Sequence, residues 1–309
     1  MDGERLKPHG AAAPYTVGFD LGGTNLKVVA LTGDGTELGC WTESSGDDPE
    51  SWVRKIRGML GTLQEQVGRP ASWVGIAAPG LVARDQRSVA WMQGRLDALT
   101  GLDWTDALGL GVTVPVINDA HAALLGEAWL GAAAGCSNVM MLTLGTGVGG
   151  GAMVDGHLLR GHLGRAGHLG HICLDPDGPP DIVGTPGTLE EAIGDCTVAR
   201  RTNGRFTTTE ALVDAHRRGE AEATDIWLRS VYLLACGIVS LINVLDPEMI
   251  VIGGGIARAG DELFQPLTRF VHSLEWRPTG VSVPIVPARL GAFAGAYGAA
   301  RHALTSCAT

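Results

Sequence analysis

The chain has 309 residues and a mass of 32.1 kDa. At about 150 residues per domain, this length predicts two domains, each large enough to bury a core of its own. Hydrophobic residues make up 45% of the chain and charged residues 18%, a composition that excludes an intrinsically disordered protein. Lys and Arg number 23 against 33 Asp and Glu, and the resulting net charge of −10 disfavours binding to nucleic acid or to anionic membranes.

The cysteine pattern favours the cytoplasm, because the six cysteines form no Cys-x-x-Cys pair and are expected to be reduced thiols. Residues 1–14 lack the basic start and apolar run of a signal peptide. The most apolar stretch, residues 231–245, includes Ser240 and Asn243 and is shorter than the roughly 20 apolar residues that span a bilayer. We therefore expect a cytoplasmic protein in which this stretch is a buried core helix.

The first third of the chain predicts half of a mixed α/β domain. Residues 25–31 alternate between two faces, which is typical of a strand, and residues 17–20 form a further strand before a tight turn. A third strand is expected at residues 37–42. The spacing of apolar residues predicts a helix over residues 49–67, and a strand follows at 73–78.

The same arrangement of strand, glycine turn and strand recurs in the middle of the chain. Residues 81–111 show no regular pattern, and a short strand at 115–119 ends in polar residues before a helix at 120–130. The recurrence then occupies residues 138–154, with its glycine turn at 145–151. This repeat suggests two related halves.

The remainder continues the α/β pattern. Residues 161–190 are rich in Gly, His, Pro and Asp and are expected to form an ordered functional loop. Two helices are predicted next, at residues 209–217 and 223–245, followed by a strand at 248–252 with a Gly-Gly-Gly turn at 253–255. The last predicted elements are a helix at 260–274, a strand at 281–286 and a closing helix at 291–303.

Two glycine turns have the chemistry of an anion site. Residues 20–25 (Asp-Leu-Gly-Gly-Thr-Asn) and 143–149 (Thr-Leu-Gly-Thr-Gly-Val-Gly) each offer backbone N–H groups and a Thr hydroxyl. Glycine permits both the close approach of an anion and the positive φ at which consecutive N–H groups converge. Asp20 would repel a bare phosphate, which favours a divalent cation between the two. Ordinary hairpins with a buried Asp are the alternative, but the pair of turns with a third at 253–255 favours a nucleotide.

Two commoner glycine motifs do not fit. The chain has no Gly-x-x-x-x-Gly-Lys-[Ser/Thr], which excludes a P-loop. Gly145, Gly147 and Gly150 match the spacing of the dinucleotide-binding fingerprint, but that motif requires a helix directly after the glycines. A short strand is predicted there, so we interpret the match as accidental.

Five motifs, in order, resemble those of the ROK sugar kinases, the bacterial glucokinase-like group within the actin-like ATPase fold. They are Asp20-Leu-Gly-Gly-Thr-Asn25, Ile117-Asn-Asp-Ala120, Leu144-Gly-Thr-Gly-Val-Gly-Gly150, Gly167-His-Leu-Gly-His171 and Ile252-Gly-Gly-Gly255. The resemblance implies a two-domain α/β, ribonuclease H-like fold with an active-site cleft between the domains. Residues 1–117 with 292–309 would form the N-terminal domain and residues 118–291 the C-terminal domain. It also implies a homodimer.

In ROK kinases the first two glycine turns grip the ATP phosphates and the third lies by the adenosine. The resemblance therefore implies ATP and Mg²⁺ as cofactors, with Asp20 organising Mg²⁺ through phosphates or water. The implied nucleotide contacts are Asp20, Gly22, Gly23, Thr24, Asn25, Lys27, Thr146, Gly147, Gly253, Gly254 and Gly255.

The Asn-Asp-Ala motif carries the acid–base chemistry in the family. By resemblance Asp119 is the general base on the sugar hydroxyl, and Asn118 holds a neighbouring hydroxyl. Independently, Asp119 ends a strand and begins a helix, whose N-terminus favours an ionised carboxylate. The alternative is a helix N-cap without chemistry.

The sequence departs from the family at its zinc motif, where residues 181–190 lack all three cysteines. Zinc takes about four ligands, which His171 alone cannot supply, so no zinc site is expected. Glu190 and His171 are still expected to bind the sugar.

Two further departures concern substrate specificity. His168 replaces a sugar-binding glutamate of the family and changes two hydrogen-bond acceptors to one donor and one acceptor. In another loop Gln93 or Arg95 would take the place of a family Asn. Such changes can select a different sugar.

The sequence thus predicts an ATP-dependent kinase for a hydroxyl, the 6-hydroxyl, of a hexose such as glucose. An amino sugar, fructose, mannose or a sugar-like cyclitol are alternative substrates, and polyphosphate is an alternative donor. A sugar-sensing ROK protein without catalysis is the alternative from another functional class.

Overall fold

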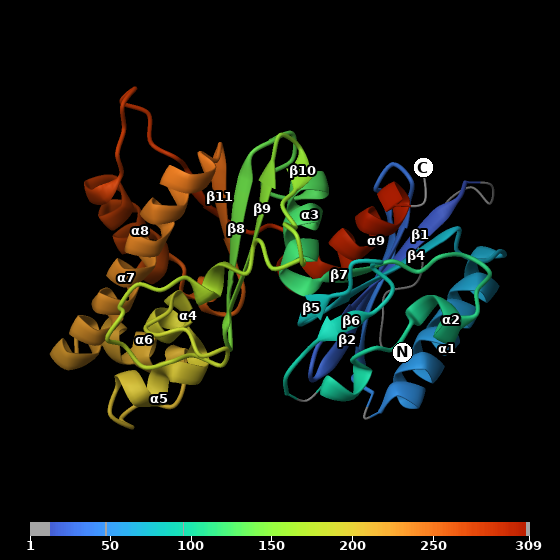
Figure 1. Cartoon of the computed structure of the whole chain (residues 1–309), viewed down its shortest axis with the longest axis horizontal. Coiled ribbons are helices and arrows are strands. Elements are labelled where there is room, and N and C mark those ends of the chain that lie inside the picture. Colours follow the sequence, from blue (N-terminus) through green and yellow to red (C-terminus); the bar gives the residue numbers. More distant parts are fainter. Residues whose placement is uncertain (1–12, 47, 95, 307–309) are drawn as a thin grey trace. The chain divides into compact units, whose positions relative to one another are not determined.

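The computed structural model describes residues 13–46, 48–94 and 96–306. Its contacts divide the chain into two compact units, which are described separately (Figure 1). The first unit comprises the chain up to residue 134, residues 160–165 and the chain from residue 289. The second comprises residues 135–159 and 166–288.

The first unit contains a five-stranded sheet of order β3-β2-β1-β4-β7. Strands β1, β2 and β3 are antiparallel, whereas β4 and β7 run parallel to β1. The carboxyl ends of β1, β4 and β7 therefore lie at one edge of the sheet, which is where α/β proteins commonly place their functional groups. The strands are Tyr15–Leu21 (β1), Asn25–Thr32 (β2), Glu37–Ser44 (β3), Trp73–Ala78 (β4) and Val116–Asn118 (β7).

The second unit repeats this topology in a sheet of order β10-β9-β8-β11-β12. Its first three strands are again antiparallel, and β11 and β12 run parallel to β8. The strands are Val139–Leu144 (β8), Val148–Val154 (β9), His157–Leu158 (β10), Met249–Gly253 (β11) and Ile285–Pro287 (β12). The identical order of strands confirms the internal repeat that the sequence suggests.

Helix α1 (Pro49–Val67) matches its predicted bounds because both of its ends carry strong signals. The Asp48 side chain accepts a hydrogen bond from the Ser51 amide, and Pro49 occupies the first helical position. Gly68 ends the helix in the left-handed region at a φ of 82°. The Trp52 and Ile56 side chains on the inner face are buried in the core of the first unit.

Residues 81–111 contain more structure than the sequence predicts. They form a two-stranded sheet, a 3₁₀ turn and a short helix: Leu81–Val82 (β5), Val89–Trp91 (β6), Asp97–Leu99 (η1) and Trp104–Leu108 (α2). These elements are too short for a periodic pattern to be visible.

Helices α3 (Asp119–Leu130) and α9 (Ala294–Ser306) pack closely together in the first unit. A Cβ on Gly298 of α9 would overlap the carbonyl of Ala122 in α3, and a Cβ on Gly18 of β1 would overlap α9 at Ala296. Because α3 packs on α9, contacts place residues 118–134 in the first unit, whereas the predicted boundary lies at residue 117. Residues 160–165 also join this unit, which the predicted division does not include.

The helices of the second unit surround a core built on α7 (Ala221–Leu245). This helix is long and apolar enough to span a membrane by length and composition. Its Trp227, Val231, Leu234 and Ile238 side chains belong to the hydrophobic core, as expected of a core helix in a globular unit. The other helices are Leu189–Ile193 (α4), Val198–Arg201 (α5), Thr209–Arg217 (α6) and Asp261–Leu274 (α8).

Two predicted elements are shorter in the structure, and one strand has no predicted counterpart. The glycine turn predicted over residues 145–151 is shorter, because Gly149–Gly151 pair with β8 as part of β9. Strand β10, which follows the turn at residues 155–156, has no counterpart among the predictions. The strand predicted at 281–286 is confined to β12, because only its last residues pair with β11. The hairpin of β8 and β9 confirms that Gly145, Gly147 and Gly150 are not a dinucleotide fingerprint, since no helix follows them.

We predict that Gly298→Ala destabilises the protein by about 3 kcal/mol, the upper end of ordinary overpacking costs, because its Cβ meets backbone atoms that cannot rotate away. Thermal unfolding measures the loss as a lower Tm. Gly58→Ala is the matched control, since Gly58 lies in α1 with no neighbouring atom within 4 Å of a Cβ. It should raise stability by about 0.5–1 kcal/mol. Equal effects of the two substitutions would contradict the close packing of α9.

Candidate active site

The first glycine turn joins β1 to β2. The Gly22 amide donates to the Asn25 carbonyl at 3.0 Å, and the Ser45 hydroxyl donates to the Gly22 carbonyl at 2.6 Å. A Cβ on Gly22 would lie 2.8 Å from the Asn25 carbonyl oxygen, so a close approach requires glycine. The predicted positive φ is wrong for this turn, because neither Gly22 nor Gly23 is in the left-handed region. Thr24 and Asn25 are exposed at its tip.

Two acidic side chains and one lysine gather at the carboxyl edge of the first sheet. Asp20 is opposite Lys27 in the antiparallel pair of β1 and β2, and the Lys27 Nζ lies 3.8 Å from the Asp20 Oδ2. In the sheet, Asp20 of β1 lies opposite Ala77 of β4, and Ala77 lies opposite Ile117 of β7. Asp119 comes two residues after Ile117, just beyond the end of β7. The sequence alone places Lys27 and Asp119 92 positions apart, and only the sheet brings them to one edge.

Burial dominates the electrostatics of this cluster. It raises the pKa of Asp20 to about 7, while the Lys27 charge opposes the rise and the Asp119 charge adds to it. Burial also raises the pKa of Asp119, against the hydrogen bond from the Ala120 amide and the charge of Lys27. The helix N-terminus, through the Ala120 amide, therefore favours the ionised form of Asp119 as expected, but desolvation has the larger effect on its pKa.

Asn118, rather than Asp119, caps helix α3. Its Oδ1 accepts hydrogen bonds from the amides of Ala120 and His121, and its Nδ2 donates to the Gly80 carbonyl at 3.1 Å. This excludes the alternative in which Asp119 serves as the N-cap, and Asp119 becomes the first residue of α3. Asn118 holds the strand-to-helix junction in place, and its predicted contact with a sugar hydroxyl stays a prediction.

Gly295 gives the Asp20 carboxylate its room. A Cβ on Gly295 would lie 2.8 Å from the Cγ and Oδ2 of Asp20, so the start of α9 passes directly beside this carboxylate. A larger residue at position 295 would therefore displace either helix α9 or the Asp20 carboxylate.

The second and third glycine turns adjoin each other in the second unit. Residues 145–147 join β8 to β9, and backbone amides of Asp195 and Cys196 donate to the carbonyls of Gly145 and Thr146. Gly254 follows β11, the parallel neighbour of β8, at a φ of 87° and in close contact with the Leu144 backbone. Here the predicted positive φ is present in the third turn, whereas Gly145 and Gly147 do not have it.

The predicted sugar loop packs against the second glycine turn. The Val148 amide donates to the Glu190 Oε2 at 2.9 Å, and a Cβ on Gly147 would overlap that same oxygen. On the other side, a Cβ on Gly170 would overlap the Val148 carbonyl, so the 3₁₀ turn Leu169–His171 (η2) also contacts this turn. Two predicted sugar-binding segments and a predicted phosphate-binding turn are thus in direct contact.

His171 is held by a carboxylate that the sequence analysis did not include among the site residues. Its Nδ1 lies 2.7 Å from the Oδ2 of Asp181, whose side chain is fully buried. The Asp181 Oδ1 accepts hydrogen bonds from the Val183 and Thr185 amides, each at 3.0 Å. Burial by itself would raise the pKa of Asp181, but the hydrogen bonds from His171 and the two amides lower it below its usual range.

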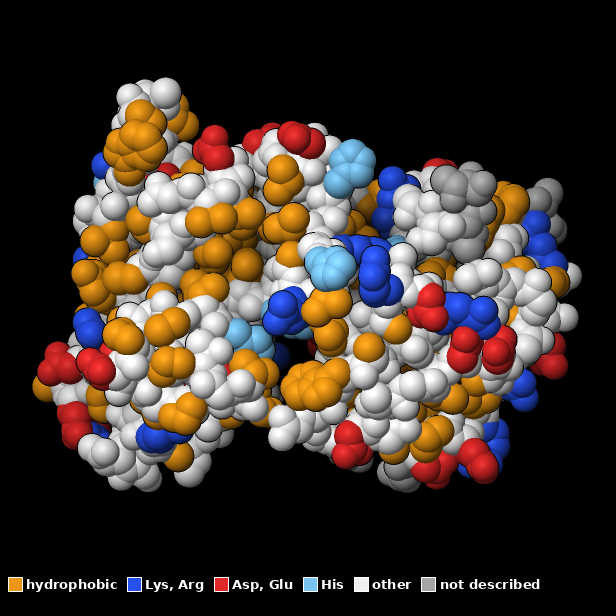
Figure 2. All heavy atoms as spheres, viewed as in Figure 1, with side chains coloured by type: hydrophobic (Ala, Val, Ile, Leu, Met, Phe, Trp, Pro, Cys, Tyr) orange, Lys and Arg blue, Asp and Glu red, His pale blue; other side chains and the backbone are white. Residues whose placement is uncertain are grey.

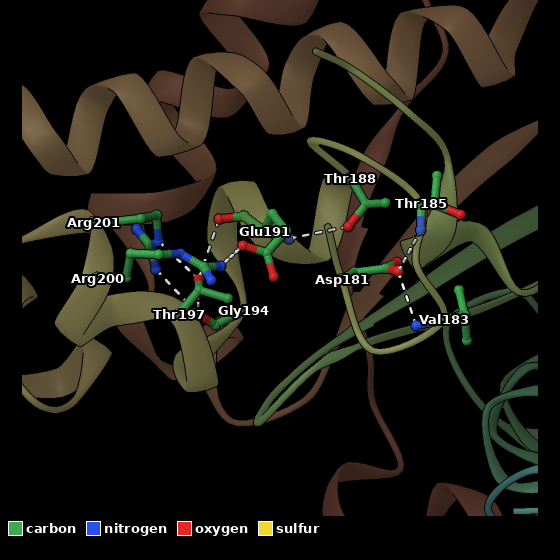
Figure 3. A network of polar contacts seen from close by, with 9 residues as sticks. All are labelled: Asp181, Val183, Thr185, Thr188, Glu191, Gly194, Thr197, Arg200 and Arg201. Atoms are coloured by element: carbon green, nitrogen blue, oxygen red, sulfur yellow. Dashed lines mark hydrogen bonds and ion pairs between the residues drawn. The ribbon is translucent and has the colours of Figure 1, made fainter. Parts of the chain in front are cut away.

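The residues that replace the family cysteines thus form hydrogen bonds of their own. Asp181 pairs with His171, and the Thr188 hydroxyl caps α4 by accepting from the Glu191 amide (Figure 3). Among the described residues there is no group of three or more His, Cys, Asp or Glu that could hold a metal ion. The expected absence of zinc stays a prediction.

A second network anchors helix α4 and with it Glu190. Figure 3 shows Glu191 ion-paired with Arg200, while Arg201 donates to the Thr197 hydroxyl and to the Gly194 carbonyl. Thr197 in turn donates to carbonyls of this segment. These contacts hold the segment that carries Glu190, whose own carboxylate accepts from the Val148 amide.

The remaining predicted specificity residues are less defined. His168 precedes η2 and is half-buried, and burial lowers its pKa, which favours a neutral imidazole. Gln93 is exposed two residues after β6. Arg95 lies outside the described residues. The structure therefore brings His171 and Glu190 to one place and leaves the roles of Gln93 and Arg95 as predictions.

Comparison with known proteins decides the family. The sequence pattern of the ROK family matches residues 16–306, nearly the whole chain. The chain belongs to the ROK family. A glucokinase from Thermotoga maritima is 35% identical over 273 residues, which cover 81% of this chain and 85% of that protein.

Two solved ROK structures are similar over nearly their full length. A ROK hexokinase from Thermus thermophilus has a TM-score of 0.82 and 29% identity, covering 94% of this chain and 98% of that chain. A ROK family glucokinase from Streptomyces griseus, in complex with glucose and AMPPNP, has a TM-score of 0.76 and 27% identity, covering 94% and 99%. The predicted family and the predicted actin-like, two-domain α/β fold class are confirmed, and these relatives support the predicted ATP-dependent hexose kinase activity.

We predict a pH-dependent effect of Asp20→Asn on stability. The pKa of Asp20 is about 7 in the folded protein and 3.8 for an unperturbed side chain, so the folded protein holds this proton more tightly. The stability gained from the protonated group is complete below about pH 4 and lost as the pH rises through about 7. Because Asn stays neutral, the Tm of Asp20→Asn relative to the wild type should be a few degrees higher at about pH 8 than at about pH 4.

The matched control is Asp85→Asn, which removes an exposed carboxylate in the same unit. Its Tm difference from the wild type should be alike at both pH values. An Asp20→Asn difference that does not change with pH would contradict the burial of an ionisable Asp20. Both variants are measured by thermal unfolding without nucleotide, so the test does not depend on activity.

Proposed function

We propose that this ROK protein is a kinase that transfers the γ-phosphate of ATP to the 6-hydroxyl of a hexose such as glucose. The observation that carries the proposal is Asp119, a half-buried carboxylate at the carboxyl edge of the first sheet, whose neighbour Asn118 caps α3. A carboxylate that the helix does not need as a cap is available for chemistry.

Asp119 acts as the general base. It orients the sugar hydroxyl and accepts its proton as the oxygen attacks the γ-phosphorus, and ADP leaves. The raised pKa of Asp119 suits this task, because a base works best when its pKa approaches the working pH. The hydroxyl proton moves to a carboxylate oxygen, and the other oxygen of Asp119 keeps its hydrogen bond from the Ala120 amide.

Phosphate binding falls to backbone amides, Thr hydroxyls and Lys27. The turn at residues 22–25 and the turn at residues 145–147 offer small residues with exposed Thr24 and Thr146 at their tips. Lys27 supplies a positive charge beside Asp20. Such groups neutralise the charge of the transferring phosphoryl group, which is the main requirement of this reaction.

The residues fit Mg²⁺, which would be held by Asp20 together with phosphate oxygens or water. The donor set is oxygen, which this cation prefers, and Mg²⁺ in kinases is bound by one or two carboxylates plus substrate phosphates. A cation would also relieve the mutual repulsion that raises the pKa of Asp20 next to Asp119. When bound, Mg²⁺ neutralises developing negative charge on the phosphates.

The second unit would supply the sugar contacts. His171 and Glu190 flank a backbone pairing in which the Leu189 amide donates to the Ile172 carbonyl at 3.0 Å. Glu190 accepts from the Val148 amide, and Gly170, the neighbour of His171, lies against the Val148 carbonyl, next to the predicted phosphate turn. An imidazole and a carboxylate in this position suit a vicinal pair of sugar hydroxyls.

We further propose a cytoplasmic homodimer. Large apolar side chains are exposed on the second unit, with Trp276 and Val281 each 72% exposed and Val244 77% exposed. Figure 2 shows hydrophobic side chains gathered over this part of the molecule, and such patches often mark contacts between proteins. Light scattering of the purified chain measures its mass in solution, and a mass equal to one chain would reject the dimer.

We predict that Asp119→Asn lowers kcat for glucose phosphorylation by about 10²–10⁴-fold, because Asn cannot accept the hydroxyl proton. A coupled assay of ADP release measures kcat and KM with glucose and Mg-ATP. Asp261→Asn is the matched control, since Asp261 is likewise the first residue of a helix, α8, and is exposed. It should leave kcat unchanged. An Asp119→Asn enzyme with full kcat would remove Asp119 from its role.

The same assay distinguishes the alternatives when it is run as a panel. Mannose, fructose, amino sugars and cyclitols replace glucose, and polyphosphate replaces ATP. Turnover with another sugar or donor alone would change the assigned substrate or donor, while the assignment as a kinase would hold. A protein that is stabilised by a sugar but consumes no donor with any of them would instead be a sugar sensor.

We predict that Asp181→Asn raises the KM for sugar about tenfold with a smaller change in kcat. The Asp181 carboxylate accepts a hydrogen bond from Nδ1 of His171 and so leaves Nε2 as an acceptor, whereas an Asn amide can donate to Nδ1 and reverse these roles. The control is Asp177→Asn, an exposed carboxylate of the same loop. If Asp181→Asn changed only the Tm and left KM as in the wild type, Asp181 would be structural and would not orient His171.

A further inference from the structure

A hollow of the first unit is lined, apart from Asn118, by residues that the proposed kinase reaction does not use. Its volume is about 240 Å³. Three segments form its walls, the loop after β5, the edge strand β7 with the start of α3, and residues 160–164. The lining side chains include Arg84, Gln86, Asn118, His121, Arg160 and His162. Neither Asp119 nor any other acidic residue is among the described residues that line it.

The charge of this hollow is opposite to that of the protein as a whole. Two arginines, Arg84 and Arg160, line this one pocket in a chain whose net charge is −10. Most arginines of a soluble protein are paired or fully solvated, and a pocket with two arginines and no carboxylate favours the binding of an anion.

Arg160 has no acidic partner among the described residues. Its Nη2 lies 3.5 Å from the Nε2 of His302, the hydrogen-bond partner that the structure gives it. Burial, together with the charge of Arg160, lowers the pKa of His302 to about 3, so His302 is neutral and cannot act as a counter-ion. Burial also lowers the pKa of Arg160, which is the signature of a half-buried charge without compensation.

The walls of the pocket are preformed. The Val116 amide donates to the Gln86 carbonyl at 2.7 Å, which ties the loop to the edge of β7. The loop itself is closed by a hydrogen bond from the Ala83 amide to the Ser88 carbonyl at 3.0 Å. Gln86 has a φ of 58°, a conformation that non-glycine residues adopt at a cost and that is often found at functional sites.

The size and the lining together indicate the kind of anion. Arginines present donors in a planar fork that matches the oxygens of a phosphate group. Gln86 and His162 add polar groups, and Val82, Val116 and Leu163 add apolar walls. A phosphate group alone would leave part of about 240 Å³ unfilled, so the space also admits a small polar body attached to it.

We propose that this pocket is a binding site for a small phosphate-bearing anion, held by Arg160 and Arg84. The shared chemistry is a phosphate dianion, which inorganic phosphate or a sugar phosphate can supply. The site adjoins Asn118, the cap of α3, so its ligand lies next to the residue that fixes the start of the helix carrying Asp119. The proposal does not rest on the kinase activity, because it concerns anion binding by Arg160 and Arg84, which have no assigned part in that reaction.

Isothermal titration calorimetry tests the site with the full chain. Inorganic phosphate and glucose 6-phosphate are titrated separately, with glucose, Mg²⁺ and AMPPNP present in excess to occupy the proposed active site. We expect binding to one site, weakened at least tenfold by Arg160→Gln and by Arg84→Gln. Tighter binding of glucose 6-phosphate than of phosphate would identify a sugar phosphate as the ligand, and the reverse order would identify the free anion.

Arg54→Gln is the matched control, because Arg54 is exposed on α1 in the same unit and does not line the pocket. It should leave the affinity unchanged. If Arg160→Gln fails to fold, the exposed Arg84→Gln carries the test. Absence of binding or equal affinity in all variants would overturn the proposal. So would an anion that binds the wild type only when glucose is left out, because that result would place the anion in the sugar site.

Discussion

The site depends on the burial of Asp20 and Asp119 beside one lysine. Removing a carboxylate from water is costly, and the pKa of both groups rises as a result. Lys27 compensates only part of this charge, because its Nζ is 3.8 Å from Asp20. The folded protein therefore holds an acidic pair that a cation or a proton stabilises. Such an arrangement lowers the stability of the empty protein and prepares it for phosphate-transfer chemistry.

Glycine serves two different purposes in this protein. At Gly298 and Gly18 it lets helix α9 approach α3 and the sheet so closely that a Cβ would overlap backbone atoms. At Gly295 the same closeness accommodates the Asp20 carboxylate. In the first two turns, by contrast, the glycines have ordinary φ values and are required for room near Asn25 and Glu190. Packing and ligand approach thus explain these glycines better than left-handed backbone does.

The sugar loop shows how a hydrogen-bonded framework can hold side chains in place. Asp181 accepts from His171 and from two backbone amides, while Thr188 caps the helix that carries Glu190. These contacts join residues that are at most about ten positions apart, and they hold together a segment that has little regular secondary structure. A carboxylate in this position orients an imidazole through its Nδ1 and thereby determines what its Nε2 offers to a ligand.

The sequence by itself determined the family, the two related halves and most of the long elements. Periodicity and end signals placed α1 and β4 at their observed bounds, because capping residues and apolar spacing act locally. The motif residues Asp20, Asp119, His171 and Glu190 were identified by the resemblance of short motifs to those of the ROK kinases.

Only the tertiary structure decided how these residues act. The pKa of Asp119 is raised chiefly by desolvation, an effect that the local helix N-terminus opposes and that a sequence pattern does not reveal. The pairing of His171 with Asp181, the contact of Glu190 with Val148 and the basic pocket around Arg160 likewise join separate segments. Desolvation and charge interactions follow distance in space, and a linear pattern records distance only along the chain.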